Sequence, residues 1–460
     1  MAAMYVGNAN RMSMSVAIVC MVNSTMLATP GGTTTQCQRP EEDETGSLQN
    51  EGDLPWSPSE KSFLLSSSFF GALSSIAFSG TIADYYGPAR VLFGALSCSA
   101  LLTLLVPVLA PASYAALVAS RVALGVGESF LNPSLNCIAV RWFPKEEKTT
   151  LAAFFTSGQQ LAAGFGSLFA AFLCHSALFG GWPAIFYIFG GSTALFVVVW
   201  RVFVSDTPDE SRWTSEEERK YLQERLPPPS GKKPSIRSMP WAEIARCRPL
   251  HAIISCSFAF GYSTSIMQAY LPLYLKERLG LPIRLIGVYT MAPFLVQMIV
   301  KSFILGPLID YSVRRRFIKL TPATKLAQSI GSFGASLCLV LFAVVPTCDA
   351  PHTALAILIV YGTVYGGSTC GYFTSLLSIA PKYTGTLTSI TNLSRMIASC
   401  AATTLATTLT AMDTPLKWPI LYCSAALFQF IAGCYYAICG NTDIQPWATN
   451  DRVSTKEIAR

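Results

Sequence analysis

Charged side chains are scarce in this sequence. Only 13% of its 460 residues are Asp, Glu, Lys or Arg, whereas 51% are hydrophobic, and soluble globular domains of this length do not normally show that balance. Histidine is scarcer still, with three residues in the chain. No metal-spaced His/Cys cluster, phosphate-binding loop or Ser/His/Asp constellation stands outside the hydrophobic runs, so an enzyme is the least expected class and no cofactor is expected.

Long runs of the sequence carry no charge at all. Five of them are residues 91–120, 149–200, 326–348, 350–381 and 418–442. Each can cross a hydrocarbon core about 30 Å thick at about 1.5 Å per helical residue. Dividing the runs at Pro, Gly and polar breaks, and adding runs with one or two charges, predicts twelve membrane-spanning helices. They are residues 4–27, 61–83, 91–109, 113–142, 149–176, 183–204, 250–275, 286–309, 324–345, 353–379, 383–409 and 417–438. We therefore expect an all-α membrane protein.

The first candidate span is the weakest of the twelve, because it contains Asn8, Asn10 and Arg11 and begins almost at the first residue. A signal peptide is the competing interpretation. We reject it because the positive charge lies inside the segment and no small-residue cleavage site clearly follows an apolar run.

A polar stretch divides the candidate spans into two sets of six. We expect an N-terminal six-helix bundle at residues 1–204, a linker at 205–248, a C-terminal six-helix bundle at 249–440 and a tail at 441–460. Within the linker, Thr214 or Ser215 is followed three residues later by glutamate, which is a capping box. This pattern predicts a short surface helix from Glu216 to Leu226.

Basic residues predict the orientation of the chain. Of the 33 lysines and arginines, 4 lie within candidate spans, 6 lie in loops on one side and 23 lie on the side that holds both termini. The positive-inside rule then places both termini in the cytoplasm. The net charge of +7 needs no nucleic-acid partner, since its excess faces the anionic lipid headgroups of the bilayer.

An internal repeat supports the division into two halves. Gly80 and Asp84, followed by Arg90, end the second candidate span, and Gly306 and Asp310, followed by three arginines, end the eighth. Glycine allows close helix contact, and an aspartate at the membrane edge can bind the N-terminus of a neighbouring helix. We interpret Gly80, Asp84, Arg90, Gly306 and Asp310 as a conformational latch between the two bundles.

Five charges lie deep inside candidate spans, away from the span ends, where each costs at least a few kcal/mol and is a functional hypothesis. They are Arg11, Arg121, Glu128, Lys301 and Arg395. Their net charge is positive, so a cavity that holds them is expected to bind a small anion.

Each of these charges has a structural alternative. Arg121 and Glu128 are two helical turns apart, so they form either a structural ion pair, or separate contacts, or a proton-responsive switch. Arg11 is an anion ligand or extends to the nearby surface. Lys301 pairs with an acid or lines the cavity, and Arg395 is equally open.

The sequence resembles solute carrier family 17, the anion:cation symporters that include sialin, the vesicular glutamate transporters and type I sodium-phosphate cotransporters. The resemblance covers nearly the whole chain. Its motifs are residues 11–23, Arg121 with Gly125, Glu128 and Pro133, and residues 181–190, 240–241, 379–383 and 445–448.

The resemblance implies a major facilitator fold with alternating access. It implies that Arg11 contacts the substrate anion and that Arg121 and Glu128 couple transport to a proton or sodium ion. Arg11 stands so near the first residue that part of the usual first helix is expected to be missing from this sequence.

The sequence departs from the family at several positions. Leu124 replaces the second acid of proton-coupled members, and Phe260 replaces an arginine of the vesicular glutamate transporters, which disfavours glutamate. Ser13 replaces the usual asparagine, and Ser378 replaces an aspartate. We therefore expect substrate contacts that differ from those of the family, made by Arg11, Ser13, Lys301 and Arg395.

Two functions remain open. The first is a secondary transporter of a small organic anion or inorganic phosphate, in a plasma, vesicle or lysosome membrane. The second is a non-transporting receptor or scaffold that kept the transporter fold. The departures from the family pattern at Leu124 and Ser378 motivate this alternative.

Overall fold

The computed structural model describes residues 1–21, 54, 56, 58–144, 147–175, 181–226, 240–281, 283–347, 350–411 and 416–448. Residues 227–239 of the predicted linker and 449–460 of the predicted tail lie outside this part of the chain. Each candidate span coincides with a helix or with consecutive helices. The first half forms α1 (Ala2–Met21), α2 (Pro58–Tyr86), α3 (Pro88–Ala112), α4 (Tyr114–Ser129), α5 (Leu131–Trp142), α6 (Lys148–Leu161), η2 (Ala162–Gly166), α7 (Ser167–His175) and α8 (Pro183–Phe203).

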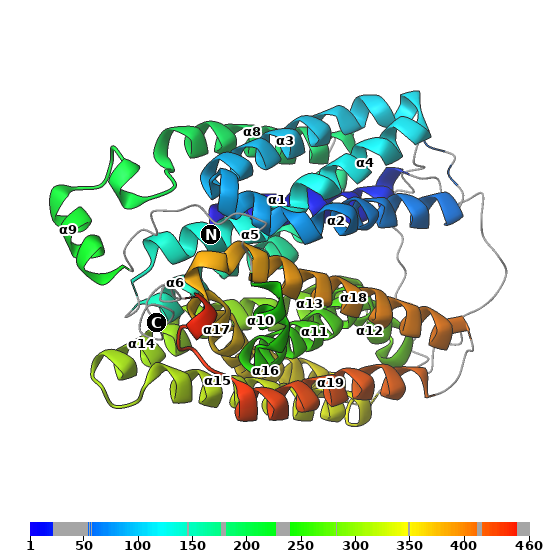
Figure 1. Ribbon diagram of the computed structural model, residues 1–460. Helices are drawn as coiled ribbons and strands as arrows, with labels where there is room; N and C mark the ends of the chain where they lie inside the picture. Colours follow the sequence, from blue (N-terminus) through cyan, green and yellow to red (C-terminus); the bar gives the residue numbers. More distant parts are fainter. Residues whose placement is uncertain are drawn as a thin grey trace.

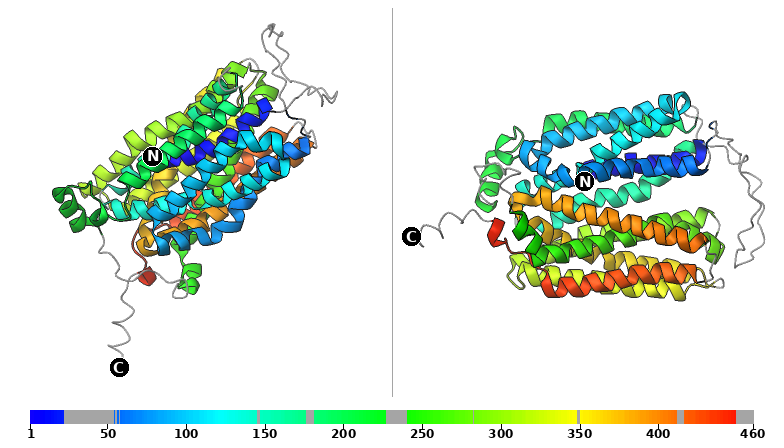
Figure 2. Two further views of the ribbon diagram at one scale, coloured as in Figure 1. Left: turned by 90° about the horizontal axis from the view of Figure 1, so that it is seen from above. Right: turned by 45° about the vertical axis from the view of Figure 1, so that its right-hand side comes forward.

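The second half repeats this pattern after the short helices α9 (Glu216–Arg225) and α10 (Trp241–Arg246). It forms α11 (Arg248–Ala269), α12 (Leu271–Leu279), α13 (Ile283–Ile299), η6 (Val300–Leu305), α14 (Gly306–Arg314), α15 (Leu320–Val344), α16 (His352–Ser368), η7 (Thr369–Phe373), α17 (Thr374–Ile379), α18 (Thr384–Ala411) and α19 (Lys417–Cys439). Helices α1–α8 lie in one bundle and α11–α19 in a second bundle beside it (Figures 1 and 2). The N-terminus of α9 is capped by Ser215, whose Oγ accepts from Glu218 N at 3.2 Å, as the capping box predicts.

Nine helices in the described part of the chain are long and apolar enough to cross a membrane. Three predicted spans are not among the nine, namely α1, the segment α6–η2–α7, and α18. All three nevertheless run alongside the other helices (Figure 1). Their lower hydrophobicity has a structural reason, because each faces the space between the bundles.

Several spans are interrupted within the membrane. The span predicted at residues 113–142 forms two helices, α4 and α5, which meet at Phe130. Pro133 lies just past this junction and has no N–H to donate to a carbonyl of the preceding turn. Elsewhere π-helical turns widen the helix at η2, η6 and η7, and such turns are frequent at functional sites.

Candidate functional site

A cavity of about 130 Å³ lies between the two bundles. Its walls come from α1, α2, α4, α5 and α6 on one side and from α11 and α18 on the other. The three charged residues that line it are Arg11, Glu128 and Arg395. The polar helices α1, α6 and α18 all contribute to the wall, which explains why they are less hydrophobic than the other spans.

Arg11 on α1 and Arg395 on α18 lie on opposite walls of the cavity, and each packs against an aromatic ring. The Arg11 guanidinium lies 4.5 Å from the ring centroid of Phe69 on α2, and the Arg395 guanidinium lies 5.4 Å from that of Phe260 on α11. A ring face holds the guanidinium plane in place while its N–H donors stay free at the edge. The structure therefore brings together two of the predicted anion ligands, each oriented by an aromatic residue.

Gly261 makes room for the Arg395 stem. A Cβ atom at Gly261 would lie 2.4 Å from Arg395 Cγ and 2.6 Å from its carbonyl oxygen. No real Cβ contact is that short, so α11 and α18 reach this separation only because residue 261 has no side chain. Phe260 and Gly261 together set the position of the arginine.

Arg121 and Glu128 form no ion pair among the described residues, so of the predicted alternatives the separate contacts and the proton-responsive switch stay open. The Arg121 side chain is buried against Phe186 of α8, at 5.4 Å from the ring centroid, and does not line the cavity. Its Nε and Nη2 atoms have no hydrogen-bond partner among the described residues. Glu128 does line the cavity, and its Oε1 is likewise buried without a partner in that part of the chain. The positive charges of Arg11 and Arg121 both attract this carboxylate electrostatically.

Ser13 and Lys301 lie outside the cavity in this conformation. Ser13 is buried and its hydroxyl donates to Asn10 O at 2.7 Å, within its own helix. Lys301 is fully buried in the π turn η6 and its Nζ donates to Thr156 Oγ1 at 2.9 Å and Gln160 Oε1 at 3.0 Å, both on α6. Lys301 therefore neither pairs with an acid nor lines the cavity, but connects the two bundles.

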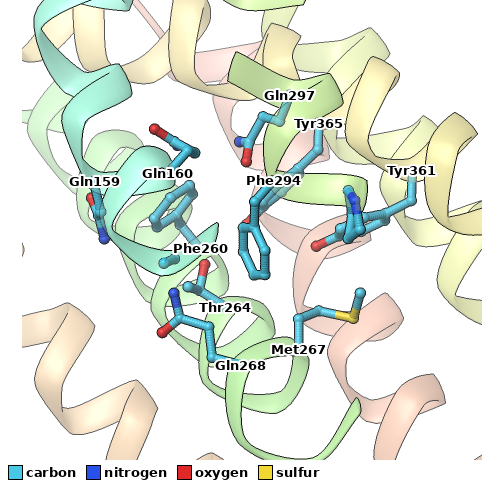
Figure 3. Close-up of a pocket in the computed structure, with 12 residues that line it drawn as sticks. Gln159, Gln160, Phe260, Thr264, Met267, Gln268, Phe294, Gln297, Tyr361 and Tyr365 are labelled. Atoms are coloured by element: carbon cyan, nitrogen blue, oxygen red, sulfur yellow. The ribbon is translucent and has the colours of Figure 1, made fainter. Parts of the chain in front are cut away.

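A smaller side chamber of about 20 Å³ adjoins the cavity between α6, α11, α13 and α16 (Figure 3). The two spaces share Gln159, Phe260, Thr264 and Gln268. Among the described residues, none that lines the chamber is charged; its polar groups are amides and hydroxyls. These residues are uncharged, so the pattern of charges within the predicted spans does not indicate them. The glutamines at 159, 160, 268 and 297, unusual in membrane helices, are the signal that was available.

The two repeated aspartates contact the opposite bundle. Asp84 on α2 accepts from the backbone N–H groups of Gly385 and Thr386, at 3.3 and 3.1 Å, at the N-terminus of α18. Asp310 on α14 accepts from Thr149 N at 3.3 Å and Thr150 N at 2.6 Å, at the N-terminus of α6. Both carboxylates thus occupy the positive end of a helix in the other half. These are the hydrogen bonds that the latch interpretation requires.

The glycines of the repeat allow this close approach. A Cβ atom at Gly80 would lie 1.9 Å from Gly385 O, and one at Gly306 would lie 3.0 Å from Thr150 Cα. Side chains at these positions would therefore separate the bundles. Arg90 is exposed on α3, and it makes none of the contacts of the latch.

Comparison with known proteins agrees with this architecture. The family model "Major Facilitator Superfamily" matches residues 6–403. The "Uncharacterized transporter slc-17.3" of Caenorhabditis elegans is 29% identical over 95% of this chain and 86% of its own. A "Putative inorganic phosphate cotransporter" of Drosophila ananassae is 29% identical over 96% and 92%. The "Probable small intestine urate exporter" of Homo sapiens is 28% identical over 95% and 88%. Among solved structures, the proton:xylose symporter XylE aligns with a TM-score of 0.65 and 15% identity over 96% of this chain and 95% of its own.

The chain belongs to the Major Facilitator Superfamily. It is an integral, multi-pass membrane transporter and not an enzyme, and the relatives confirm its resemblance to solute carrier family 17.

Proposed function

We propose that this protein is a secondary active transporter of a small organic anion or inorganic phosphate, and that the cavity between the bundles is its substrate site. One observation carries the proposal: two guanidinium groups, Arg11 and Arg395, line the cavity and only one acid, Glu128, does. An anion that enters gains charge-assisted hydrogen bonds, and it offsets the cost of unbalanced positive charge in the membrane. Relatives named as a phosphate cotransporter and a urate exporter support an anionic substrate.

Alternating access follows from where the bundles are joined. Residues 1–204 and 249–440 are proposed to move as two bodies linked by 205–248, with both termini in the cytoplasm. Hydrogen bonds between the bundles gather at the ends of α2, α14 and the starts of α6, α18. Ala89 lies at the start of α3, directly after α2, and its N–H donates at 2.7 Å to Asp206, which lies between α8 and α9. The bundles are therefore joined at the end of the molecule that carries α9. With both termini proposed to lie in the cytoplasm, this joined end is the proposed cytoplasmic end, and we propose that the conformation is closed on that side.

Glu128 is the proposed coupling residue. Its carboxylate faces the cavity, and Arg11 and Arg121 act on it. When the carboxylate is charged it competes with the substrate for Arg11; a proton on Glu128 removes that competition. Substrate and proton then bind together, which is the requirement for symport.

We expect Glu128→Gln to make transport insensitive to an imposed pH gradient. The amide keeps the shape of the side chain but cannot take up a proton. In proteoliposomes loaded at fixed pH, wild-type uptake of labelled phosphate or urate should rise at least several-fold when the pH outside is lowered, whereas the variant should give the same uptake with and without the gradient.

Glu277→Gln provides a control, since Glu277 forms an ion pair with Lys417 at 2.8 Å and does not line the cavity. Its pH response should match wild type. If Glu128→Gln retains the wild-type response, Glu128 is not the coupling residue. Binding of an anion without flux under any pH, sodium or voltage gradient would instead favour a receptor.

Lys301→Met is expected to leave anion affinity within about twofold of wild type. Lys301 does not line the cavity, so its replacement removes no group that contacts the substrate. Arg395→Met, at a residue that does line it, should weaken binding about tenfold. Equilibrium binding of labelled phosphate and urate to purified protein measures both, and equal losses in the two variants would place Lys301 at the substrate.

A further inference from the structure

The uncharged lining of the side chamber indicates a feature of the substrate that the charged cavity does not indicate. In Figure 3, Gln160, Phe260, Phe294 and Gln297 surround the same space. Anions are disfavoured there, because no cation lines the chamber. Lys301 lies behind its wall, and its ammonium is occupied by Thr156 and Gln160.

Two buried polar groups that line the chamber, Gln297 Nε2 and the Tyr361 hydroxyl, have no hydrogen-bond partner among the described residues, and of the two only the amide NH₂ is purely a donor. Gln297 is 4% exposed, and its Nε2 makes no hydrogen bond within the described residues. Other polar groups nearby do have partners: Gln160 Oε1 accepts from Lys301, and the Tyr365 hydroxyl accepts from Gln429 Nε2 at 3.1 Å. A buried amide donor is normally satisfied, so an unused one at a binding cavity indicates a missing acceptor.

The size of the chamber limits that acceptor. A volume of about 20 Å³ holds one group the size of a water molecule, which needs about 10–15 Å³. The chamber and the main cavity share Gln159, Phe260, Thr264 and Gln268 in their walls, so the two spaces lie side by side. A substrate arm that extends from the cavity past these side chains would end in the chamber.

We infer that the substrate is an organic anion whose charged end lies between Arg11 and Arg395, and whose uncharged arm ends in a carbonyl or hydroxyl oxygen that accepts a hydrogen bond from Gln297. This inference rests on the proposed function and narrows it, because a compact ion such as inorganic phosphate has no arm that could reach Gln297 from the cavity. Phe260 contacts both parts, with its ring under the Arg395 guanidinium and 5.5 Å from the Tyr365 ring.

The test compares matched pairs of ligands. Purified full-length protein is titrated with oxo-carboxylates that carry the carbonyl two to five carbons from the carboxylate, each paired with the plain alkanoate of equal length, and with phosphate. We expect at least one oxo acid to bind about tenfold more tightly than its alkanoate, as one added hydrogen bond to a buried donor allows. Gln297→Met should abolish that preference, so that the oxo acid and its alkanoate bind equally.

Two controls separate the inference from the function on which it rests. Met267→Leu changes an apolar wall of the same chamber and should keep the preference. Arg11→Ala should weaken every ligand of the panel alike. The inference is overturned if no oxo acid is preferred, if the preference survives Gln297→Met, or if no anion binds to wild type. The proposed function fails separately, if Arg11→Ala leaves anion binding intact.

Discussion

Replacing Arg11 by alanine is expected to reduce anion uptake about 100-fold. Hydrogen bonds to charged groups contribute about 1.5–3 kcal/mol, and Arg11 offers two parallel donors to an anion in a cavity that faces a low-dielectric medium. Arg395 remains on the opposite wall, which is why the loss is not total. Removal of Arg11 also leaves the Glu128 carboxylate facing the cavity with one cation fewer.

Arg11→Lys separates charge from geometry. The ammonium keeps the positive charge but cannot stack its plane on Phe69 or donate in a bidentate fork, so uptake should recover only to about one tenth of wild type. Initial rates of labelled phosphate and urate uptake, normalised to protein in the membrane, measure both variants. The matched control is Arg314→Ala, at an exposed arginine near the end of α14. Arg11→Ala transport above half of wild type would remove Arg11 from the site.

The helices were predictable because each satisfies a local requirement. A run without charge that is long enough to cross the bilayer has few alternatives to a helix, and all twelve candidate spans coincide with helices. The interruptions were less predictable. The break at Phe130 has a local cause in Pro133, but the π turns of η2, η6 and η7 follow from packing between segments far apart in the chain.

The site was predictable only in part, because spacing gives the face of a helix and not its neighbour. Arg121 and Glu128 are two turns apart, yet Arg121 is buried against α8 whereas Glu128 lines the cavity. Lys301 was expected near the substrate and instead contacts α6. The side chamber joins Gln159 of one bundle to Gln297 of the other, and a single sequence does not show which helices meet there.

Loss of both repeated aspartates is expected to open the cytoplasmic end of the transporter. Each carboxylate caps a helix of the opposite bundle, and removal of such a cap with its charge costs about 1–2 kcal/mol. Asp84 and Asp310 act at different helix pairs, α2 with α18 and α14 with α6, so their contributions should be roughly additive. Asp84→Ala together with Asp310→Ala should therefore shift the equilibrium toward the cytoplasm-open state by about 30- to 1000-fold.

Spin labels on the two bundles report this shift directly. Arg201→Cys on α8 and Arg315→Cys after α14 place labels at exposed residues of each bundle, in a background without other exposed cysteines. Double electron–electron resonance should give mainly a short distance between the two labels in wild type and mainly a longer one in the double aspartate variant. Each single variant should show an intermediate mixture of the two distances. Asp206→Ala is the matched control, because Asp206 caps α3 of its own bundle through Ala89 N at 2.7 Å. It should lower thermal stability without changing the distance; an equal shift in that control, or none in the double variant, would show that the aspartates do not hold the bundles together.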